Sequence, residues 1–533
     1  MKNNLLVVLF VVLIFVGCGT KEPTTENANP LSVLPENVMV SIIINNSTGM
    51  VNNIDGYIEE GAAVIGQNFL ENLICTELHI SSFDSIPVNY GIDPSGQIVF
   101  WMENATPQSM GLAASAPDFD LFITVLEDLG QEVVTEEPIN DVVVYSVNTD
   151  NGTKYLAGNN GVALVAASLS KLEEMLTNLS TDQVFELAPT SLTINVNLAM
   201  IGPMAAAQMP MAKMMMMQGM ASDTTMPDFV PAMMDVYMDG FEAILTQADQ
   251  LEFTLITGSE EFVMKKRVSF LPETELATMF VATEAQDMLP FITQGDIATV
   301  RYQMPEELTF TISKAFSEVF TTEISDEMIG FWSEITANGA MSLFSGDFVH
   351  MVAAYETDGS VTLEQIAEMF SEYFDAILPI LQQNEEMAAA FSIQDNGIVQ
   401  IDGFDFYSIS MNILSDSEVD FNFDYWITIH DGVMLLETAE HPGILLDIIS
   451  GGYTPADLPG TGAMAGEMSL AGYLGMVMSL NQDGMELPEI DSDVIISWDS
   501  YCEDGVVYNE MSFDGSDAVA TGFVFAGLIG STL

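Results

Sequence analysis

Basic residues are scarce in this chain. Its 10 Lys plus Arg stand against 78 Asp plus Glu, which gives a formal net charge of −68, and no Lys or Arg follows Lys314. Nucleic acids and anionic lipid headgroups carry the same sign of charge, so both are excluded as natural partners. The carboxylates beyond Lys314 have no Lys or Arg in their own segment. We therefore expect them to be solvated, protonated or neutralised by counter-cations from the medium.

Motifs of the common catalytic classes are also missing. The chain has 4 histidines and contains no HExxH, no GxSxG, no Walker-type Gly-Lys loop and no GxGxxG after a strand. A hydrolase that uses paired carboxylates stays open as an alternative, because 78 acids offer many pairs and the pattern singles out none. The sequence therefore predicts no catalytic residue and no cofactor.

The longest apolar run lies at the N-terminus. Lys2 precedes an apolar stretch at 5–16 that is short for a membrane span and ends in FVGC at Cys18. This pattern resembles a bacterial lipoprotein signal. The resemblance implies that residues 1–17 are removed, that Cys18 becomes lipidated, and that the protein is extracytoplasmic and anchored to a bacterial membrane through this lipid. An ordinary secretory signal or an N-terminal membrane anchor is the alternative.

The rest of the chain is predicted to be a tether followed by folded domains. Residues 18–30 are polar and have little to bury, which is typical of a tether. No later apolar run reaches about 18 residues, so no further membrane span is predicted. With 533 residues and 49% hydrophobic content, the chain can bury a large core in more than one domain. Its acidity is typical either of adaptation to salty surroundings or of an ordinary acidic envelope protein.

An internal repeat governs the predicted architecture. Residues 251–281 align with residues 494–524 without a gap, and both copies are predicted to form a strand, a polar turn, a strand and a short helix. The sequence thus predicts an α+β protein of two related halves, 31–285 and 286–533, each a mostly antiparallel sheet with helices packed on one face. The offset between repeats indicates a methionine-rich helical insertion near 200–228 in the first half.

A weaker repeat pairs the segment from Asn159 with the segment from His430. In each, a Gly-led apolar strand runs into a helix, which starts at Ser170 with Glu173 in capping-box spacing in one copy and near Pro442 in the other. This arrangement, together with the signal and the turn GIDPSG at 91–96, resembles uncharacterised exported bacterial lipoproteins built from duplicated α+β units. Those families imply no catalytic residues.

Within the first half, hydrophobic patterning predicts individual elements. It favours strands at 38–44, 98–102 and 142–147, and helices at 50–73 and 119–129. The turn Thr149-Asp150-Asn151-Gly152 is typical of a hairpin.

The methionines at 209–220 admit three interpretations. Met211, Met214, Met217 and Met220 stand three apart on one ridge of a helix, and thioethers at such spacing can ligate Cu(I). No His or Cys lies nearby, however, and the chain has 36 methionines, so packing of a helix against the core is favoured. A surface that binds a protein or apolar partner is the third interpretation.

The stretch SEVDFNFDYWITIH at 417–430 alternates with a period of two. Glu418, Asp420 and Asp424 fall on one face, which raises the hypothesis of a calcium site. Side chains on one strand face lie about 7 Å apart, too far to surround one ion, so a solvated strand face is favoured.

Two cysteines remain once Cys18 is acylated. Cys75 and Cys502 would form a disulfide in an oxidising compartment, and burial as free thiols is the alternative. The leading functional hypothesis is a non-enzymatic scaffold or binding lipoprotein of the cell envelope with an exposed apolar surface near the methionines. The alternative is an envelope hydrolase or a protein that handles calcium or copper.

Overall fold

The computed structural model divides into two compact units. Unit 1 comprises Met1–Ile201, Asp249–Val268 and Ser512–Leu533, and unit 2 comprises Gly202–Ala248 and Ser269–Met511. The structure describes residues 28–514 apart from 62–70, 72–74, 76–84, 150–151, 180–189, 222–228, 259–260, 281–286, 321–324, 346–349, 382–390, 415–419, 459, 461, 474–494 and 504.

The units do not coincide with the predicted halves. The boundary at 285/286 falls inside unit 2, because Gly202–Ala248 and the segment from Ser269 group with the second half of the chain. The predicted halves describe a sequence repeat, whereas the units are compact bodies, so the boundaries of the repeat stay a prediction.

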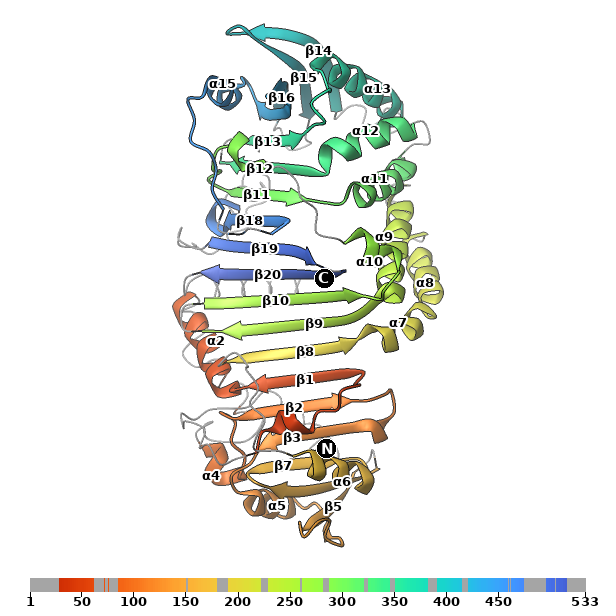
Figure 1. Cartoon of the computed structure of the whole chain (residues 1–533), viewed down its shortest axis with the longest axis vertical. Helices are drawn as coiled ribbons and strands as arrows, with labels where there is room; N and C mark the ends of the chain where they lie inside the picture. The colour runs from red at the N-terminus through yellow and green to blue at the C-terminus, as the bar shows by residue number, and fades with distance from the viewer. Residues whose placement is uncertain are drawn as a thin grey trace. The chain divides into compact units, whose positions relative to one another are not determined.

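Unit 1 contains an antiparallel sheet (Figure 1). The strands follow the order β10-β9-β8-β1-β2-β3-β7-β6-β5-β4, and neighbours from β9 to β4 pair antiparallel. Their bounds are β1 Val40–Asn45, β2 Gln97–Met102, β3 Met110–Ser115, β4 Val133–Thr135, β5 Val144–Thr149, β6 Gly152–Asn159, β7 Val162–Ala166, β8 Ser191–Asn197, β9 Ala248–Thr257 and β10 Glu261–Phe270.

Unit 2 contains a second antiparallel arrangement with the same order. Its strands run β20-β19-β18-β11-β12-β13-β17-β16-β15-β14, and neighbours from β19 to β14 pair antiparallel. Their bounds are β11 Ala298–Gln303, β12 Asn338–Phe344, β13 His350–Glu356, β14 Phe391–Ile401, β15 Phe404–Leu414, β16 Asp420–His430, β17 Val433–Ala439, β18 Met464–Ser469, β19 Ile495–Glu503 and β20 Val506–Asp514.

Each strand of unit 1 therefore has a counterpart in unit 2, from β1 and β11 through β10 and β20. The aligned segments 251–281 and 494–524 fall on the corresponding hairpins β9–β10 and β19–β20. A helix, α10 (Glu275–Met279), follows the first copy as predicted. The helix expected after the second copy lies outside the described residues.

The main helices connect the strands. They are α2 Ser47–Gly61, α4 Ile86–Tyr90, α5 Phe119–Asp128, α6 Leu169–Asn178, α7 Leu198–Ala206, α8 Met209–Ala221, α9 Phe229–Gln247, α11 Glu306–Phe320, α12 Asp326–Thr336, α13 Leu363–Leu381 and α15 Gly443–Ser450. None of the helices in the described part of the chain is long and apolar enough to cross a membrane.

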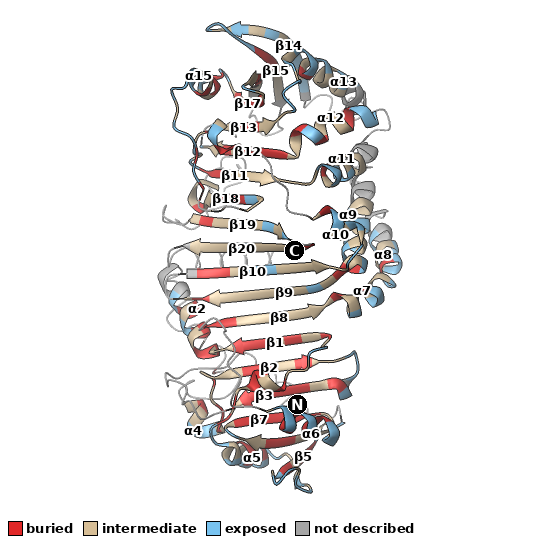
Figure 2. Ribbon diagram, in the orientation of Figure 1, coloured by how far each residue is buried: buried red, intermediate tan, exposed pale blue. Residues whose placement is uncertain are grey.

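Helices cover both faces of the sheet in each unit, which corrects the prediction of helices on one face. In unit 1, Ile98 packs with Phe122 of α5 on one face, while Val99 packs with Leu172 of α6 on the other. The physical reason is visible in β7, VALVA, which is apolar at every position and buried along its whole length, so both of its faces need a cover (Figure 2).

Unit 2 repeats this pattern. Tyr407 belongs to a cluster with Ile335 of α12 and Ile366 of α13, whereas its neighbour Phe406 belongs to a cluster with Leu445 of α15. Alternate residues of one strand thus serve two cores.

Most elements predicted for the first half are confirmed with small shifts. The predicted strands correspond to β1, β2 and β5, and the helix at 119–129 to α5. The predicted hairpin joins β5 and β6, with Thr149 paired to Gly152. The helix expected at 50–73 is described as α2, which begins earlier, at Ser47, and ends at Gly61.

The weaker repeat marks equivalent hairpins. Asn160 and Gly161 have φ of 48° and 75° between β6 and β7, and Asp431 and Gly432 have φ of 51° and 78° between β16 and β17. Two successive left-handed residues match the twist of a two-residue hairpin.

Helices follow both of these hairpins, and the start of one differs from the prediction. The N-cap of α6 is Ser168 rather than Ser170, because Ser168 has extended backbone and its Oγ accepts the Lys171 N–H at 3.2 Å.

A candidate interaction surface on the methionine helix

Helices α7, α8 and α9 fill the connection between β8 and β9. This connection runs over 198–247, whereas the corresponding one between β18 and β19 runs over 470–494, about half the length. The extra length agrees with the insertion that the repeat offset indicates. The methionine string forms α8 itself.

An ion-pair cluster fixes α8 against α9. Lys213 Nζ of α8 lies 2.6 Å from Asp235 Oδ1 and 2.9 Å from Asp239 Oδ1, both on α9. The two aspartates are four residues apart and so share one face of α9. Their side-chain hydrogen bonds raise the pKa of Lys213 above its usual value. Lys213 is therefore charged at any physiological pH and marks the side of α8 that faces α9.

Four methionines of α8 are exposed. Met211, Met214, Met215 and Met216 expose 62%, 54%, 59% and 45% of their surface, whereas Met209 is buried at 8%. Met211 and Met215 stand two residues on either side of Lys213, which places them about 200° around the helix from it. For Met211 and Met214, the prediction of packing against the core is therefore wrong. The Lys213 contact turns Met211 outward, and Met214 is exposed on the flank of the helix, about 100° from Lys213.

For the other two members of the predicted methionine ridge, the structure describes only the backbone. Met217 and Met220 lie within the backbone of α8, but their side chains are outside the described residues. The four exposed methionines at 211 and 214–216 are called the methionine surface below.

A second apolar row lies on α9. Tyr237, Phe241 and Ile244 are exposed and stand at i, i+4 and i+7, which places them on one face of the helix. This face is turned about 160° from Asp235 and hence away from the contact with α8. The two helices thus expose separate apolar rows.

The surroundings of these rows are acidic. Unit 2 has only Lys213, Arg301 and Lys314 as Lys or Arg. Each is paired: Lys213 as above, Arg301 Nη1 at 3.7 Å from Asp287 Oδ1, and Lys314 Nζ at 2.9 Å from Asp326 Oδ1. Further acids lie on α9, which contacts α8, and on α11, which contacts α9: Glu242 on α9, and Glu306 and Glu307 on α11.

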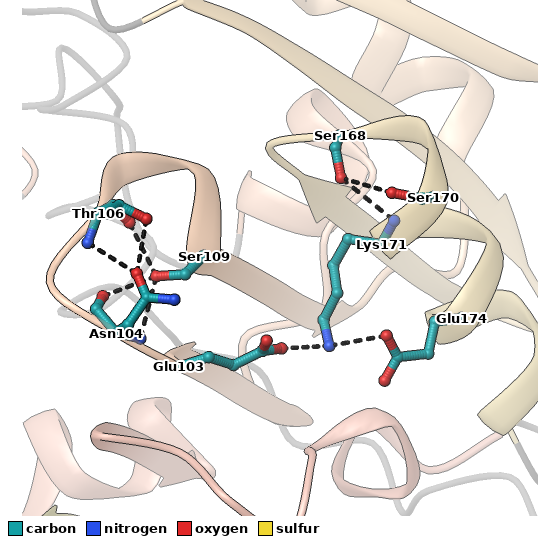
Figure 3. A network of polar contacts seen from close by, with 8 residues as sticks. All are labelled: Glu103, Asn104, Thr106, Ser109, Ser168, Ser170, Lys171 and Glu174. Atoms are coloured by element: carbon teal, nitrogen blue, oxygen red, sulfur yellow. Dashed lines mark hydrogen bonds and ion pairs between the residues drawn. The ribbon is translucent and has the colours of Figure 1, made fainter. Parts of the chain in front are cut away.

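A polar network in unit 1 has a structural role. Lys171, at the start of α6 and nearly buried, forms an ion pair with Glu103 and another with Glu174 at 3.1 Å (Figure 3). Ser109 Oγ accepts the Asn104 N–H at 3.1 Å in the same turn. The network fastens the start of α6 to the segment after β2.

Unit 2 contains a buried carboxylate that sequence reasoning missed. Glu437 on β17 is 1% exposed and accepts the Ile444 and Leu445 N–H groups at 3.3 and 2.9 Å. His350 Nε2 lies 2.9 Å from the Oε1 atom of the same carboxylate. Glu437 thereby caps α15, whose N-cap residue Pro442 makes no side-chain cap hydrogen bond. The available signal was a Glu inside the otherwise apolar strand VMLLETA just before a helix that lacks a capping side chain.

The predicted calcium cluster is only partly described. Residues 420–430 form β16 as predicted, Asp424 is half-buried, and the Asp420 side chain and all of Glu418 lie outside the described residues. Across the part of the chain that the structure describes, no three His, Cys, Asp or Glu side chains gather as metal ligands would. The calcium and copper hypotheses therefore stay predictions.

The cysteines do not form the predicted disulfide. Cys75 and Cys502 are both free thiols, the first buried and the second half-buried. Cys75 lies in the apolar cluster of unit 1 with Ile54 and Phe262, and burial raises its pKa to about 11. Burial also raises the pKa of Cys502. Cys18 lies outside the described residues.

Comparisons with known proteins identify no family for this chain. No protein-family model matches the chain, and no curated protein matches it in sequence. Among solved structures, crystal forms IV, III and I of the treponemal protein TP0453 are similar to parts of it, each at 10% identity. They cover 49%, 46% and 46% of this chain and 87%, 81% and 80% of TP0453, with TM-scores of 0.25, 0.24 and 0.23. TM-scores this low identify neither a fold nor a function.

Proposed function

We propose that the protein is a lipoprotein of the bacterial cell envelope, anchored through Cys18 outside the cytoplasm, that binds a partner and catalyses no reaction. The proposed binding site is the methionine surface of α8. The observation that carries this proposal is that a helix apolar on nearly every side, MPMAKMMMMQGMA, buries Met209 but exposes four other methionines.

An exposed apolar surface of this kind is costly without a partner. Full burial of one Met side chain is favourable by about 1.5 to 3 kcal/mol, so a partner that covers several of them gains substantial free energy. Exposed apolar clusters are a mark of interaction sites. Unbranched thioether side chains also adapt to partners of different shape.

We further propose that the two halves, 31–285 and 286–533, are related copies of one α+β unit. The matching strand orders support this relation. In this interpretation the repeated units form the scaffold. The helices α7 to α9, which lengthen the connection between β8 and β9, carry the binding surface.

Crosslinking in cells tests the binding site. Benzoylphenylalanine, a photo-reactive residue, is introduced at Met215 in the lipoprotein and, as a control, at Val88, which is 75% exposed in unit 1. We expect a discrete crosslinked adduct from position 215 and none from position 88. No adduct at 215, or the same adducts from both positions, would overturn the proposed site.

Fractionation tests the anchor. The variant Cys18→Ser should move from the membrane fraction to the soluble extracytoplasmic fraction and lose labelling by a radioactive fatty acid. Retention of the label would contradict lipidation at Cys18.

A further inference from the structure

We propose that the partner of the methionine surface is a cationic amphipathic helix. This inference rests on the proposed function, and it specifies the chemistry of the partner. The partner would place its apolar side on Met211, Met214 and Met215 and its Lys or Arg side chains over the neighbouring carboxylates.

The charge around the methionine surface favours a cationic partner. Lys213 and Lys314, the only basic residues on α8 to α13, are already held by Asp235, Asp239 and Asp326. The excess acids of these helices, with the net charge of −68, create a negative potential around the methionine surface. This potential attracts a cationic partner, whereas it repels an anionic protein segment or an anionic membrane.

The spacing of the exposed methionines suits a helical partner. Met211, Met214 and Met215 stand at i, i+3 and i+4, so their side chains form one ridge along the axis of α8. A helical partner with apolar residues at the same spacing can pack its own ridge beside this one, as amphipathic helices do in recognition by apolar surfaces.

The methionine side chains can also adapt to partners of different sequence. Four exposed methionines supply flexible apolar contacts that suit a range of apolar side chains. An apolar surface surrounded by acids therefore favours any partner helix that has an apolar stripe flanked by cations. It does not require one exact partner sequence.

Binding of synthetic peptides tests the inference on the whole mature chain carrying Cys18→Ser. The first probe is a 14-residue peptide of Leu and Lys whose Leu residues follow helical spacing. The second keeps the Leu positions and replaces every Lys by Gln. The third keeps the Leu and Lys composition in scrambled order, which removes the apolar stripe. Affinities are measured by calorimetry at low and at high NaCl.

We expect the patterned Leu-Lys peptide to bind at least tenfold more tightly than either of the other two. A rise from about 50 to about 500 mM NaCl should weaken its binding severalfold, because salt screens exposed charges. The triple variant M211Q/M214Q/M215Q should lose at least tenfold in affinity. Gln has nearly the helix propensity of Met, so α8 should persist. The control variant I398Q/F404Q, which changes two exposed apolar residues on the β14–β15 hairpin of the same unit, should change affinity less than twofold.

The outcomes separate this inference from the proposed function. Equal binding of the Leu-Gln peptide, lost in the triple variant, would overturn the cationic partner and leave the apolar site standing. Equal binding of the scrambled peptide would show charge attraction alone and overturn the amphipathic helix. Tight binding to phosphatidylcholine vesicles, lost in the triple variant and with no peptide bound, would identify a neutral lipid surface instead. If no peptide and no vesicle binds, both proposals fail.

Discussion

At the scale of single residues, close packing leaves little tolerance in the core of unit 1. Trp101 on β2 is fully buried and pairs with Gly111 on β3. A Cβ on Gly111 would lie 2.2 Å from the Trp101 indole, well inside van der Waals contact. The indole has no room to move without disturbing the core around Val99 and Leu164.

Gly111→Ala should therefore destabilise the protein. We expect a loss of about 1 to 3 kcal/mol in the free energy of unfolding, as overpacking of a filled core costs. Urea denaturation measures the loss. The control Gly56→Ala, in α2 with nothing within 4 Å of its added Cβ, should leave stability unchanged or raise it by up to about 1 kcal/mol. Equal stability of the two variants would contradict this packing.

Burial of the Cys75 thiol makes the stability of the protein depend on pH. Its pKa of about 11 in the folded chain exceeds its ordinary value of 9.0 because burial disfavours the thiolate. Between these two values the unfolded chain loses this proton while the folded chain keeps it. The contribution of Cys75 to stability is thus complete below about pH 9 and is lost as the pH rises toward 11.

We accordingly expect stability to fall with rising pH in this alkaline range, and to fall less in Cys75→Ala. Denaturation midpoints from pH 8 to 11 measure both slopes. At pH 8, iodoacetamide should label Cys502 before Cys75, because Cys75 is the more buried. Identical slopes with and without the thiol, or faster labelling of Cys75, would contradict the burial that the structure shows.

At the scale of elements, Glu437 decides how α15 starts. Its carboxylate accepts two N–H groups of the first turn of α15, whereas the N-cap residue Pro442 makes no side-chain cap hydrogen bond. Glu437→Ala would leave these buried donors without a partner. We expect a loss of about 1 to 3 kcal/mol in stability and faster amide hydrogen exchange in α15.

The neighbouring Glu440 supplies the matched control, because it is exposed. Glu440→Ala should change the free energy of unfolding by less than about 0.5 kcal/mol. If Glu437→Ala were equally harmless, the cap would carry no stabilising role.

Patterning explains which elements could be predicted. The strands β1, β2 and β5 and the helix α5 have clear periods, and their positions follow from the sequence to within a few residues. The two faces of the sheet were misjudged, although VALVA, apolar at every position of β7, already signals burial on both sides.

The candidate site was harder to predict. A helix that is apolar all round has no periodicity that shows which side faces outward. Its orientation depends on the ion pairs from Lys213 to Asp235 and Asp239, which lie 22 and 26 residues further along the chain and could not be assigned among so many carboxylates. The cap at Glu437 likewise depends on a strand and a helix meeting in three dimensions.

At the scale of the whole molecule, charge dominates. A net charge of −68 repels itself more strongly in the compact folded state than in the expanded unfolded chain. Dissolved ions screen this repulsion over distances of about 10 Å at 0.1 M salt.

We therefore expect NaCl to raise the melting temperature. Calorimetry in a salt series from about 0.05 to 2 M should show the largest rise at the low end, where the screening length changes most. A control series at about pH 4, where half or more of the carboxylates are protonated, should show a smaller rise. An unchanged melting temperature at neutral pH would mean that self-repulsion does not limit stability.

The strand order also dictates how the chain must reach its fold. The hairpins β6–β7 and β16–β17 close within a few residues, but β1 pairs with β8 through Val40 and Val196, and β11 pairs with β18 through Ala298 and Met468. Such closures lose chain entropy before they gain contacts, so they come late and slowly. In each unit the first strand, β1 or β11, is synthesised long before its partner, β8 or β18. Until the partner strand is made, the unpaired edge of the first strand is exposed and can pair with other chains, so this edge most needs protection during synthesis.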